Sequence, residues 1–139
     1  MNRIKGAKLR IYRYAQNSME PLKVVTYNIR KCMGTDRRRD PRRVLEVLRE
    51  LDADVVALQE ADRRFGARAS AIPHHMFLEH SDYVPVDLSG RPHGIGWHGN
   101  AILVRRGSEV RHAQPLPLPT LEPRGAVVAK FYDGGVTKL

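Results

Sequence analysis

The stretch LKVVTYNIRKCMGTDRRRDPRRVLEVLRELDADVVALQE, residues 22–60, decides the fold. Its two ends, residues 22–28 and 54–60, are short, apolar and rich in β-branched residues, which predicts two buried strands. Between them, Asp40 is a good N-cap and Pro41 fits the first position of a helix, and apolar residues then recur at helical spacing. A strand, a helix and a strand in this order predict a crossover unit, which usually joins strands of the same sheet.

The rest of the chain predicts further strands with irregular connections. The expected elements are a helix over 73–80, a glycine-rich loop over 90–96, a strand at 100–105, a stiff proline-rich connector over 115–123 and a strand at 126–132. The turn signal Asp133-Gly134-Gly135 predicts a hairpin partner directly after it. Strands mixed with helices in this way indicate the α/β class.

The length of 139 residues is enough for one compact domain and too short for two. No apolar run reaches the about 18 residues that cross a bilayer, and the basic N-terminus is followed by no apolar stretch of a secretory signal. We therefore expect a soluble, cytoplasmic protein. Residues 1–20 lack a sustained apolar period, which predicts a basic, disordered extension ahead of an ordered domain at 21–139.

The net charge of +9 is concentrated in two segments. Residues 1–18 hold five basic residues and no acidic one, and residues 30–43 hold seven basic residues against two acidic ones. A basic surface raises the local concentration of phosphate-bearing ligands. Charge alone does not distinguish such a binding surface from a solvated loop.

The single cysteine, Cys32, excludes an internal disulfide and an all-cysteine zinc site. Its neighbours Arg30 and Lys31 predict a modestly lowered thiol pKa. A free thiol without a special task is the preferred interpretation.

Polar side chains stand at the ends of both strands of the crossover unit. Asn28 ends the first strand and Glu60 ends the second. Side chains at strand ends of an α/β sheet point into the crevice where ligands bind. Glu60 could supply a carboxylate to a hard cation such as Mg²⁺, and Asn28 could hold a phosphate oxygen, a metal-bound water or the Glu60 carboxylate. The alternative is that Glu60 only pairs with a nearby arginine, for example Arg63.

Two further polar residues stand at the starts of later strands. Asn100 follows a glycine at the mouth of the third strand, where a simple turn role is the alternative to a site role. Arg124 precedes the last predicted strand and could hold a phosphate through two parallel hydrogen bonds. It could equally pair with Glu60 or Asp62 as part of the scaffold.

Together these segments resemble the endonuclease/exonuclease/phosphatase family of metal-dependent phosphodiesterases. The matching segments are VVTYNIR (24–30), the helix from Asp40 to Leu51, ADVVALQEADRR (53–64), HGNAILVRR (98–106) and EPRGAVVAKF (122–131). They occur in the family's order over residues 22–139, and the combination of TYNIR with DVVALQE is the specific part. The resemblance implies the N-terminal part of a four-layer α/β sandwich, in which two packed mixed sheets are flanked by helices.

The resemblance also implies a chemistry and a role for each candidate residue. Glu60 is expected as the principal metal ligand, with Asn28 as a metal-positioning and catalytic residue, and Asn100 and Arg124 as contacts to the substrate phosphate. The implied reaction is hydrolysis of a phosphodiester or phosphomonoester by water, with Mg²⁺ or Mn²⁺ as cofactor. The implied partner is a phosphate-ester substrate, which includes nucleic acid, lipid and small esters.

One departure from the family pattern shapes the expected function. Family members are usually longer, and their second half carries a catalytic histidine, an Asp-x-Asn word and a terminal Asp-His pair, none of which is matched here. The resemblance therefore implies an N-terminal half-domain that is inactive or weakly active alone. The alternatives are a non-catalytic half-domain that binds phosphate or nucleic acid, and one subunit of a split enzyme completed by self-association or by a C-terminal half.

Overall fold

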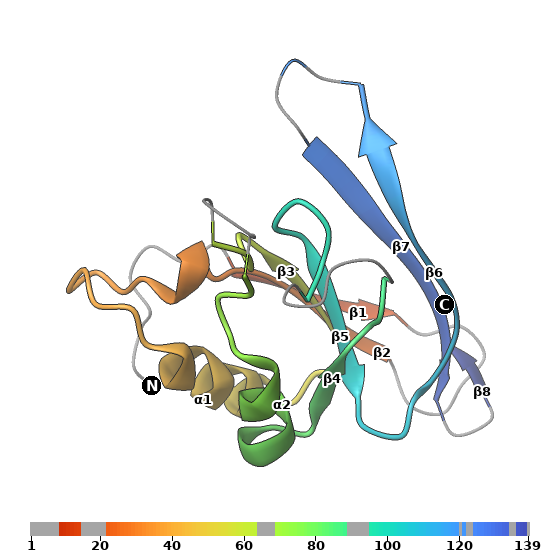
Figure 1. Ribbon diagram of the computed structural model, residues 1–139. Helices are drawn as coiled ribbons and strands as arrows, with labels where there is room; N and C mark the ends of the chain where they lie inside the picture. The colour runs from red at the N-terminus through yellow and green to blue at the C-terminus, as the bar shows by residue number, and fades with distance from the viewer. Residues whose placement is uncertain are drawn as a thin grey trace.

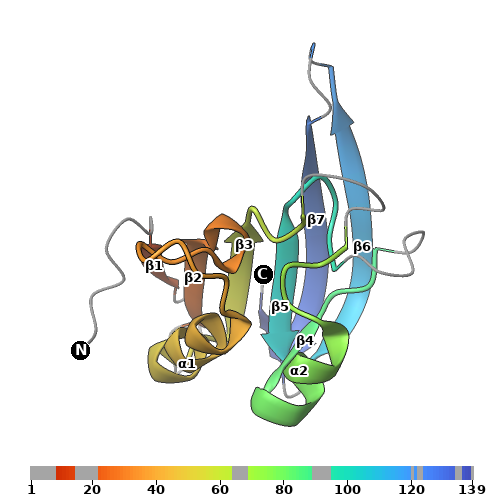
Figure 2. The same ribbon diagram turned by 60° about the vertical axis from the view of Figure 1, so that its left-hand side comes forward.

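The computed structural model of the chain describes residues 9–14, 22–63, 69–88, 95–119, 121, 124–133 and 136–138. Within this part, two β-sheets and one layer of helices make up the structure (Figure 1). Helices α1 (Pro41–Leu51) and α2 (His74–His80) cover one face of the first sheet, and the second sheet packs against the other face (Figures 1 and 2). The predicted α/β class is confirmed, and the described residues form a helix layer and two sheet layers of the sandwich.

The first sheet contains five strands in the order β1-β2-β3-β5-β4. These strands are β1 (Leu9–Tyr14), β2 (Leu22–Asn28), β3 (Val55–Gln59), β4 (Tyr83–Pro85) and β5 (Ala101–Arg105). β2 and β3 are parallel, and the other neighbouring pairs are antiparallel. The strands predicted at 22–28, 54–60 and 100–105 are confirmed, whereas β4 was not expected.

Helix α1 connects β2 to β3 as the sequence predicts. The Asp40 side chain accepts a hydrogen bond from the backbone N–H of Arg42 at 3.0 Å, which caps the first turn. The helix ends where Asp52 takes a left-handed conformation with φ 46° and donates its N–H to the Leu48 carbonyl. Among the described residues, no helix is long and apolar enough to cross a membrane.

The two faces of the first sheet bury different sets of side chains. The helix side holds the larger core, whose members include Val25, Tyr27, Leu45, Leu48, Val56, Leu58, Phe77 and Leu103. The opposite side holds a smaller cluster of Leu22, Val55, Val86 and Val104, against which Ala113 and Ala129 of the second sheet pack. This smaller cluster joins the two sheets, so the fold is a layered sandwich rather than two separate units.

The second sheet consists of β6 (Glu109–Leu118), β7 (Arg124–Asp133) and β8 (Val136–Lys138) in that order, all antiparallel. The strand predicted at 126–132 and the expected hairpin partner after residue 135 are both confirmed. The proline-rich connector is corrected, because Pro115 and Pro117 lie inside strand β6. β6 has one neighbour only, and an edge strand tolerates residues that lack an N–H.

The segment expected to be a disordered extension, residues 1–20, contains strand β1. β1 pairs antiparallel with β2 from Leu9↔Tyr27 to Tyr14↔Leu22. The expectation of disorder is therefore wrong for residues 9–14, because a free edge of β2 offered a partner that local periodicity does not reveal. The other residues of that segment lie outside the described residues, and so does most of the predicted glycine-rich loop.

Cys32 ends the one-turn helix η1 (Arg30–Cys32) and is buried. Burial raises the pKa of its thiol to about 12, and this desolvation outweighs the opposing charge of Arg39. The expected lowering by Arg30 and Lys31 is therefore wrong. Cys32 is a core residue whose Sγ lies 3.6 Å from the Ala71 carbonyl oxygen.

Candidate functional site

The parallel pairing of β2 and β3 brings Asn28 and Glu60 to the same edge of the sheet. Asn28 pairs with Gln59 at the end of the ladder, so Glu60 follows directly beyond it. Two backbone bonds then continue the pairing past the strands: the N–H of Ile29 donates to Gln59 at 3.1 Å and that of Lys31 donates to Glu60 at 2.9 Å. The backbone itself therefore sets Asn28 and Lys31 around Glu60.

Both oxygens of the Glu60 carboxylate accept a hydrogen bond. The Asn28 amide donates to Oε1 at 3.0 Å, and the Lys31 ammonium donates to Oε2 at 3.1 Å. The other end of the Asn28 amide, Oδ1, accepts the backbone N–H of Arg30 at 3.0 Å, which fixes the orientation of the side chain. The sequence suggested that Asn28 could hold a phosphate oxygen, a metal-bound water or the Glu60 carboxylate. Of these, the structure shows the hydrogen bond to the Glu60 carboxylate. The cation paired with Glu60 is Lys31, whereas the sequence had suggested Arg63.

Left-handed backbone conformations on both sides of the contact make this geometry possible. Arg30, Lys31 and Cys32 have φ values of 49°, 54° and 62°, and Glu60 has a φ of 52°. For a residue other than glycine, a left-handed backbone conformation costs on the order of 1–2 kcal/mol. Strained backbone of this kind persists only where the surrounding structure imposes it, and it concentrates at functional sites. The strain and the exposed carboxylate together mark this edge as the candidate site.

The Glu60 carboxyl is ionised and accessible. The hydrogen bond from Asn28 is the largest cause that lowers its pKa below the ordinary value, partial burial opposes the shift, and Lys31 and Arg30 lower the pKa further. The side chain remains 44% exposed. A negative charge is therefore held in place at neutral pH, within reach of a ligand from solvent.

The turn before β5 packs against the Glu60 segment. The Ala61 N–H donates to the Gly99 carbonyl at 2.9 Å, and the Gly99 N–H donates to the Asp62 carboxylate at 3.2 Å. A Cβ at Gly96 would overlap the Asn100 carbonyl, so only glycine permits this tight turn. The next residue after Gly99 is thus carried to the same side of the sheet as Glu60.

Asn100 has a structural task in this turn. Its amide donates to the Gly125 carbonyl at 2.7 Å, which ties the turn to strand β7 of the second sheet. A Cβ at Gly125 would overlap the Trp97 ring, so the close approach of the two sheets here needs a glycine. The backbone of Arg124 pairs with Leu118 beside this contact, and its side chain lies outside the described part. Phosphate contacts by Asn100 and Arg124 remain predictions.

Sequence reasoning missed Lys31 and Asp62 as members of this region. Lys31 reaches Glu60 only through the left-handed turn, and no glycine or asparagine at residues 30–32 signals such a turn. Asp62 is a carboxylate only 5% exposed that holds the 98–100 turn through the Gly99 N–H. Its position gave no strand-face signal, because Glu60 and Asp62 both lie beyond the end of β3, and only the tertiary contact with Gly99 reveals its task.

The donor set suits a hard divalent cation. Glu60 provides carboxylate oxygens, one of which accepts a hydrogen bond from the Asn28 amide, and the thiol of Cys32 is buried. Mg²⁺ often takes one or two carboxylates and completes its shell with waters and substrate phosphate. Among the described residues, no group of three or more histidines, cysteines, aspartates or glutamates comes together. A cation at this edge would therefore rest on Glu60 as the exposed carboxylate, because Asp62 is buried.

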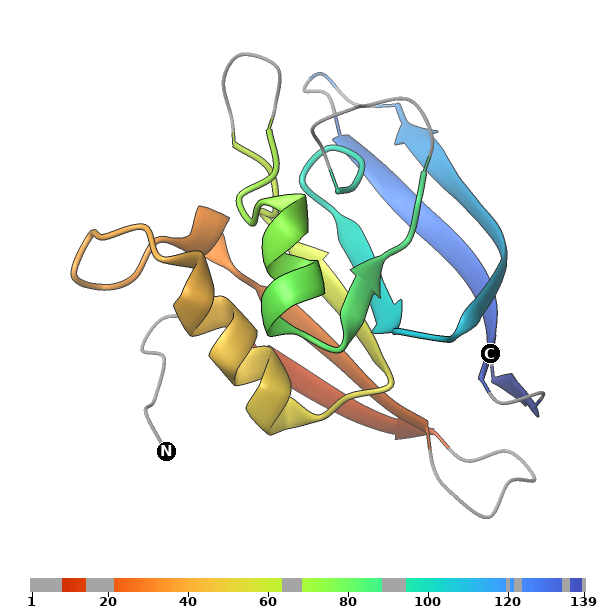
Figure 3. The ribbon, with the colours of Figure 1, turned by 60° about the horizontal axis from the view of Figure 1, so that its bottom comes forward.

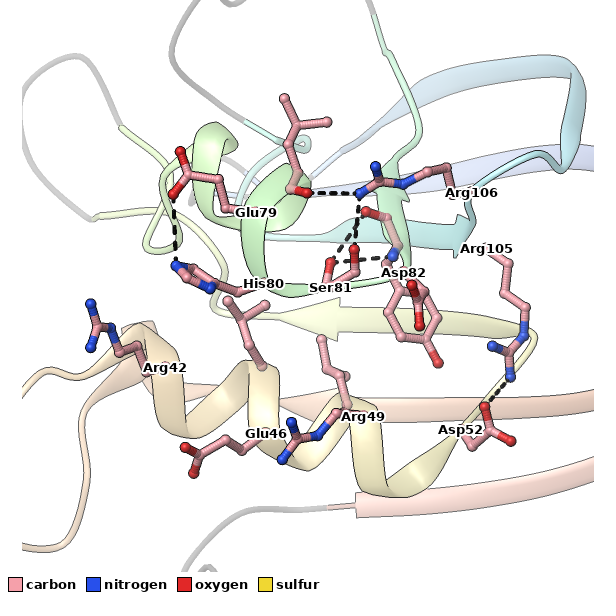
Figure 4. Close-up of a pocket in the computed structure, with 14 residues that line it drawn as sticks. Arg42, Glu46, Arg49, Asp52, Glu79, His80, Ser81, Asp82, Arg105 and Arg106 are labelled. Atoms are coloured by element: carbon pink, nitrogen blue, oxygen red, sulfur yellow. Dashed lines mark hydrogen bonds and ion pairs between the residues drawn. The ribbon is translucent and has the colours of Figure 1, made fainter.

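A cavity of about 730 Å³ lies elsewhere, between α1 and α2 (Figure 4). Its charged side chains are largely used by the fold: Arg105 pairs with Asp52, and Arg106 donates to the carbonyls of Leu78 and Ser81 at the end of α2. None of the predicted site residues lines this cavity. It is a groove between two helices, and its position does not favour it over the Glu60 edge as the reaction site.

Comparison with known families agrees with the resemblance. The sequence model of the endonuclease/exonuclease/phosphatase family matches residues 25–139, from β2 to the end of the chain. The match includes Asn28, Glu60, Asn100 and Arg124. No curated protein matches the chain.

Proposed function

The chain belongs to the endonuclease/exonuclease/phosphatase family, and on this premise we propose that it hydrolyses phosphoesters with a divalent cation held by Glu60. The family consists of nuclease- and phosphatase-like hydrolases. The observation that carries the proposal is the ionised, accessible Glu60 carboxylate, oriented by the Asn28 amide at 3.0 Å.

Each residue at this edge would have its own role in binding the cation or the substrate. Glu60 binds the cation, and Asn28 holds the carboxylate in one orientation through its bond to Oε1. When bound, Mg²⁺ or Mn²⁺ supplies a Lewis acid for the phosphoryl oxygens. The Lys31 ammonium, 3.1 Å from Glu60, adds a positive charge that attracts the substrate phosphate. Asn100 and Arg124 are proposed as further phosphate contacts.

The test is hydrolysis of bis(4-nitrophenyl) phosphate with Mg²⁺ or Mn²⁺, comparing the wild-type chain with Glu60→Gln. Loss of the carboxylate should lower the rate at least about 100-fold, because cation stabilisation of charge contributes several kcal/mol. Glu50→Gln is the matched control, since Glu50 is an exposed carboxylate on α1 outside the site. Titration of Mn²⁺ by electron paramagnetic resonance gives a second measurement that does not depend on turnover.

Two results would contradict the proposal. One is a rate that survives in Glu60→Gln or in EDTA. The other is Mn²⁺ binding that is equal in Glu60→Gln and the wild-type chain.

A second function is favoured by one specific observation. At this edge Glu60 is exposed whereas Asp62 is buried, and among the described residues no group of three or more metal-ligand side chains comes together. We propose as the alternative a module that binds phosphate groups without hydrolysis, alone or as a subunit completed by another copy or another chain. No metal-dependent turnover, together with phosphate binding that is retained, would support it. A rate that rises faster than protein concentration would instead indicate completion by self-association.

A further inference from the structure

An arginine-rich segment projects from the end of the first sheet on the side of Glu60 (Figures 1 and 3). Residues 34–43, here called the arginine loop, connect η1 to α1 and include the first turn of that helix. They hold five arginines and two aspartates. Lys31, three residues before Gly34, is the cation that contacts Glu60.

The arginine loop is a built turn with defined backbone bonds. The Gly34 N–H donates to Arg38 at 2.9 Å, and the Arg37 N–H donates back to Gly34 at 3.1 Å. At its base, Met33 and Arg39 form a bridge, and the Asp40 N–H donates to Cys32 at 3.0 Å. A solvated run of repelling charges would not need this internal bonding.

Arg43 engages both acidic residues of the loop. Its guanidinium donates to the two oxygens of Asp36 at 3.1 and 3.3 Å, and its Nε lies 3.5 Å from Asp40. The same guanidinium donates to the Arg38 carbonyl at 3.0 Å. One arginine therefore serves as the scaffold by contacting both aspartates, and five arginines against two aspartates leave the segment a net charge of +3.

Four arginines remain on the outside of this scaffold. Arg37, Arg38, Arg39 and Arg42 are all exposed, and none of them forms an ion pair within the described part of the chain. A guanidinium fork is well suited to phosphate because it donates two parallel hydrogen bonds. The fold thus presents four exposed phosphate-binding groups on the segment that follows Lys31 in the chain.

None of these four arginines is among the residues that contact Glu60, and this bears on the substrate class. A small phosphate ester at Glu60 would be within reach of Lys31 and would leave the arginines farther out unused. A polynucleotide carries one phosphate per nucleotide along each strand, so neighbouring phosphates extend beyond the reacting one.

We propose that the arginine loop binds the phosphate backbone of a polynucleotide whose reacting phosphodiester lies at Glu60. This inference rests on the proposed function and makes nucleic acid, rather than a small ester, its substrate.

Binding is tested with a fluorescein-labelled 12-nucleotide DNA strand in EDTA, so that no turnover is needed. The loop variant combines Arg37→Asn, Arg38→Gln and Arg39→Gln; asparagine is chosen at 37 because its φ is 59°. The variant keeps Arg43 and both aspartates, so the scaffold is retained. The control combines Arg49→Gln, Arg111→Gln and Lys130→Gln, which removes three exposed charges elsewhere.

The loop variant should bind the strand about tenfold more weakly at 50 mM salt, and the control should bind like wild type. Loss of three phosphate contacts should also reduce the slope of log K against log salt by about 2, at about 0.7 per contact. The conservative variant with lysine at 37, 38 and 39 should retain most of the binding. Equal affinity of the loop variant and the control would overturn the proposal.

Two further measurements separate this inference from the proposed function. Glu60→Gln should still bind the strand in EDTA, so failure of hydrolysis leaves the binding result intact. With Mg²⁺, the loop variant should lose more activity on the DNA strand than on bis(4-nitrophenyl) phosphate. Binding of wild-type protein to phosphatidylserine vesicles but not to the DNA strand would overturn the proposal in favour of a membrane surface.

Discussion

The two ends of the first sheet both carry carboxylates beside a cation, and the two clusters are built differently. At the far end from Glu60, Arg105 lies against Asp52 and Asp54, and Asp54 also accepts the backbone N–H of Lys23 at 2.8 Å. Nearby, the Tyr83 hydroxyl donates to the Ala53 carbonyl at 2.7 Å. Every one of these bonds joins two strands or a strand and a helix end, so the cluster holds the sheet together.

At the Glu60 end, the same kind of pair lies just beyond the ends of β2 and β3 and is built on strained backbone. Lys31 and Glu60 both have positive φ, and the carboxylate is 44% exposed. The comparison teaches that a carboxylate–cation pair alone does not mark a site. Three consecutive left-handed residues, 30–32, and a left-handed Glu60 distinguish this end, whereas at the other end the single left-handed Asp52 ends helix α1.

Among the residues that contact Glu60 or build the opposite cluster, the largest effect is expected from Asn28→Ala. Loss of the amide leaves Glu60 Oε1 without its donor, so the carboxylate is no longer held in one orientation. Residues that orient a metal ligand typically affect activity or metal affinity 10–100-fold, and we expect a loss of about that size in phosphodiester hydrolysis. Asp54→Asn at the other end is the control and should keep the activity of the folded protein. Unchanged Mn²⁺ affinity in Asn28→Ala would remove Asn28 from the site.

The next effect, on stability, is expected at the opposite end from Tyr83→Phe. This change removes the buried hydrogen bond to Ala53 and leaves its carbonyl without that donor. We expect a loss of about 1–2 kcal/mol in the free energy of unfolding, measured by urea denaturation. Hydrolysis per folded molecule should not change. A loss of activity without a loss of stability would mean that the two ends are coupled, which the comparison does not predict.

A smaller effect is expected from Lys31→Met. The ammonium lies 3.1 Å from Glu60 Oε2 and opposes any cation that binds the same carboxylate. Mn²⁺ affinity should therefore rise about two- to fivefold, the size expected for one exposed ion pair. Lys23→Met, at the other end of the sheet, should leave the affinity unchanged. Weaker Mn²⁺ binding in Lys31→Met would contradict this account of the lysine.

The titration of Glu60 tests the same contacts. Its pKa is lowered, so the stabilisation from these contacts is present above the ordinary value of 4.5 and is lost as the pH falls through the lower value in the folded chain. Carboxyl ¹³C NMR should show a midpoint below 4.5 in wild type. The midpoint should move upward in Asn28→Ala and, to a lesser degree, in Lys31→Met, and a midpoint that stays in place would exclude these residues as its cause.

The smallest effect is expected from Asp52→Asn. Asp52 is 75% exposed, and the hydrogen bond from Arg105 is the first cause of its lowered pKa. Exposed ion pairs contribute little and are screened by salt. We expect a slight fall in Tm at low salt that vanishes at 1 M NaCl, as a thermal melt at both salt concentrations would show. A large fall that persists at high salt would show that the pair matters more than its exposure implies.

The crossover unit was predictable because its signals are local. Asp40 and Pro41 start α1, and the apolar runs that end at Asn28 and Glu60 form neighbouring strands, so the edge carrying both residues follows from the sequence. β1 was not predicted, because residues 9–14 lack a sustained apolar period, and the strand is stabilised by its pairing with β2, which begins eight residues after β1 ends. The short strand β4 was also missed, because within the described part of the chain it is defined by its pairing with β5, a tertiary contact.

The finer geometry of the site depends on contacts that cannot be predicted from residue types alone. The Lys31–Glu60 pair arises from three consecutive left-handed residues without a glycine among them. Asn is a residue type that is common in turns, so Asn100 alone does not indicate a further contact. Its hydrogen bond to Gly125 forms because the second sheet docks there. Tertiary packing, rather than local preference, decides both.

The position of β5 between β3 and β4 has a consequence for the order of folding. The β6–β7 hairpin closes a short loop between Leu118 and Arg124, and such hairpins form within about 1–10 μs. β5 must instead find β3 across the whole of α2 and β4, and pairings of such separation form slowly. The Gly99–Ala61 bond beside Glu60 forms only when β5 arrives. We therefore expect the candidate site to be among the last parts of the chain to assemble after synthesis.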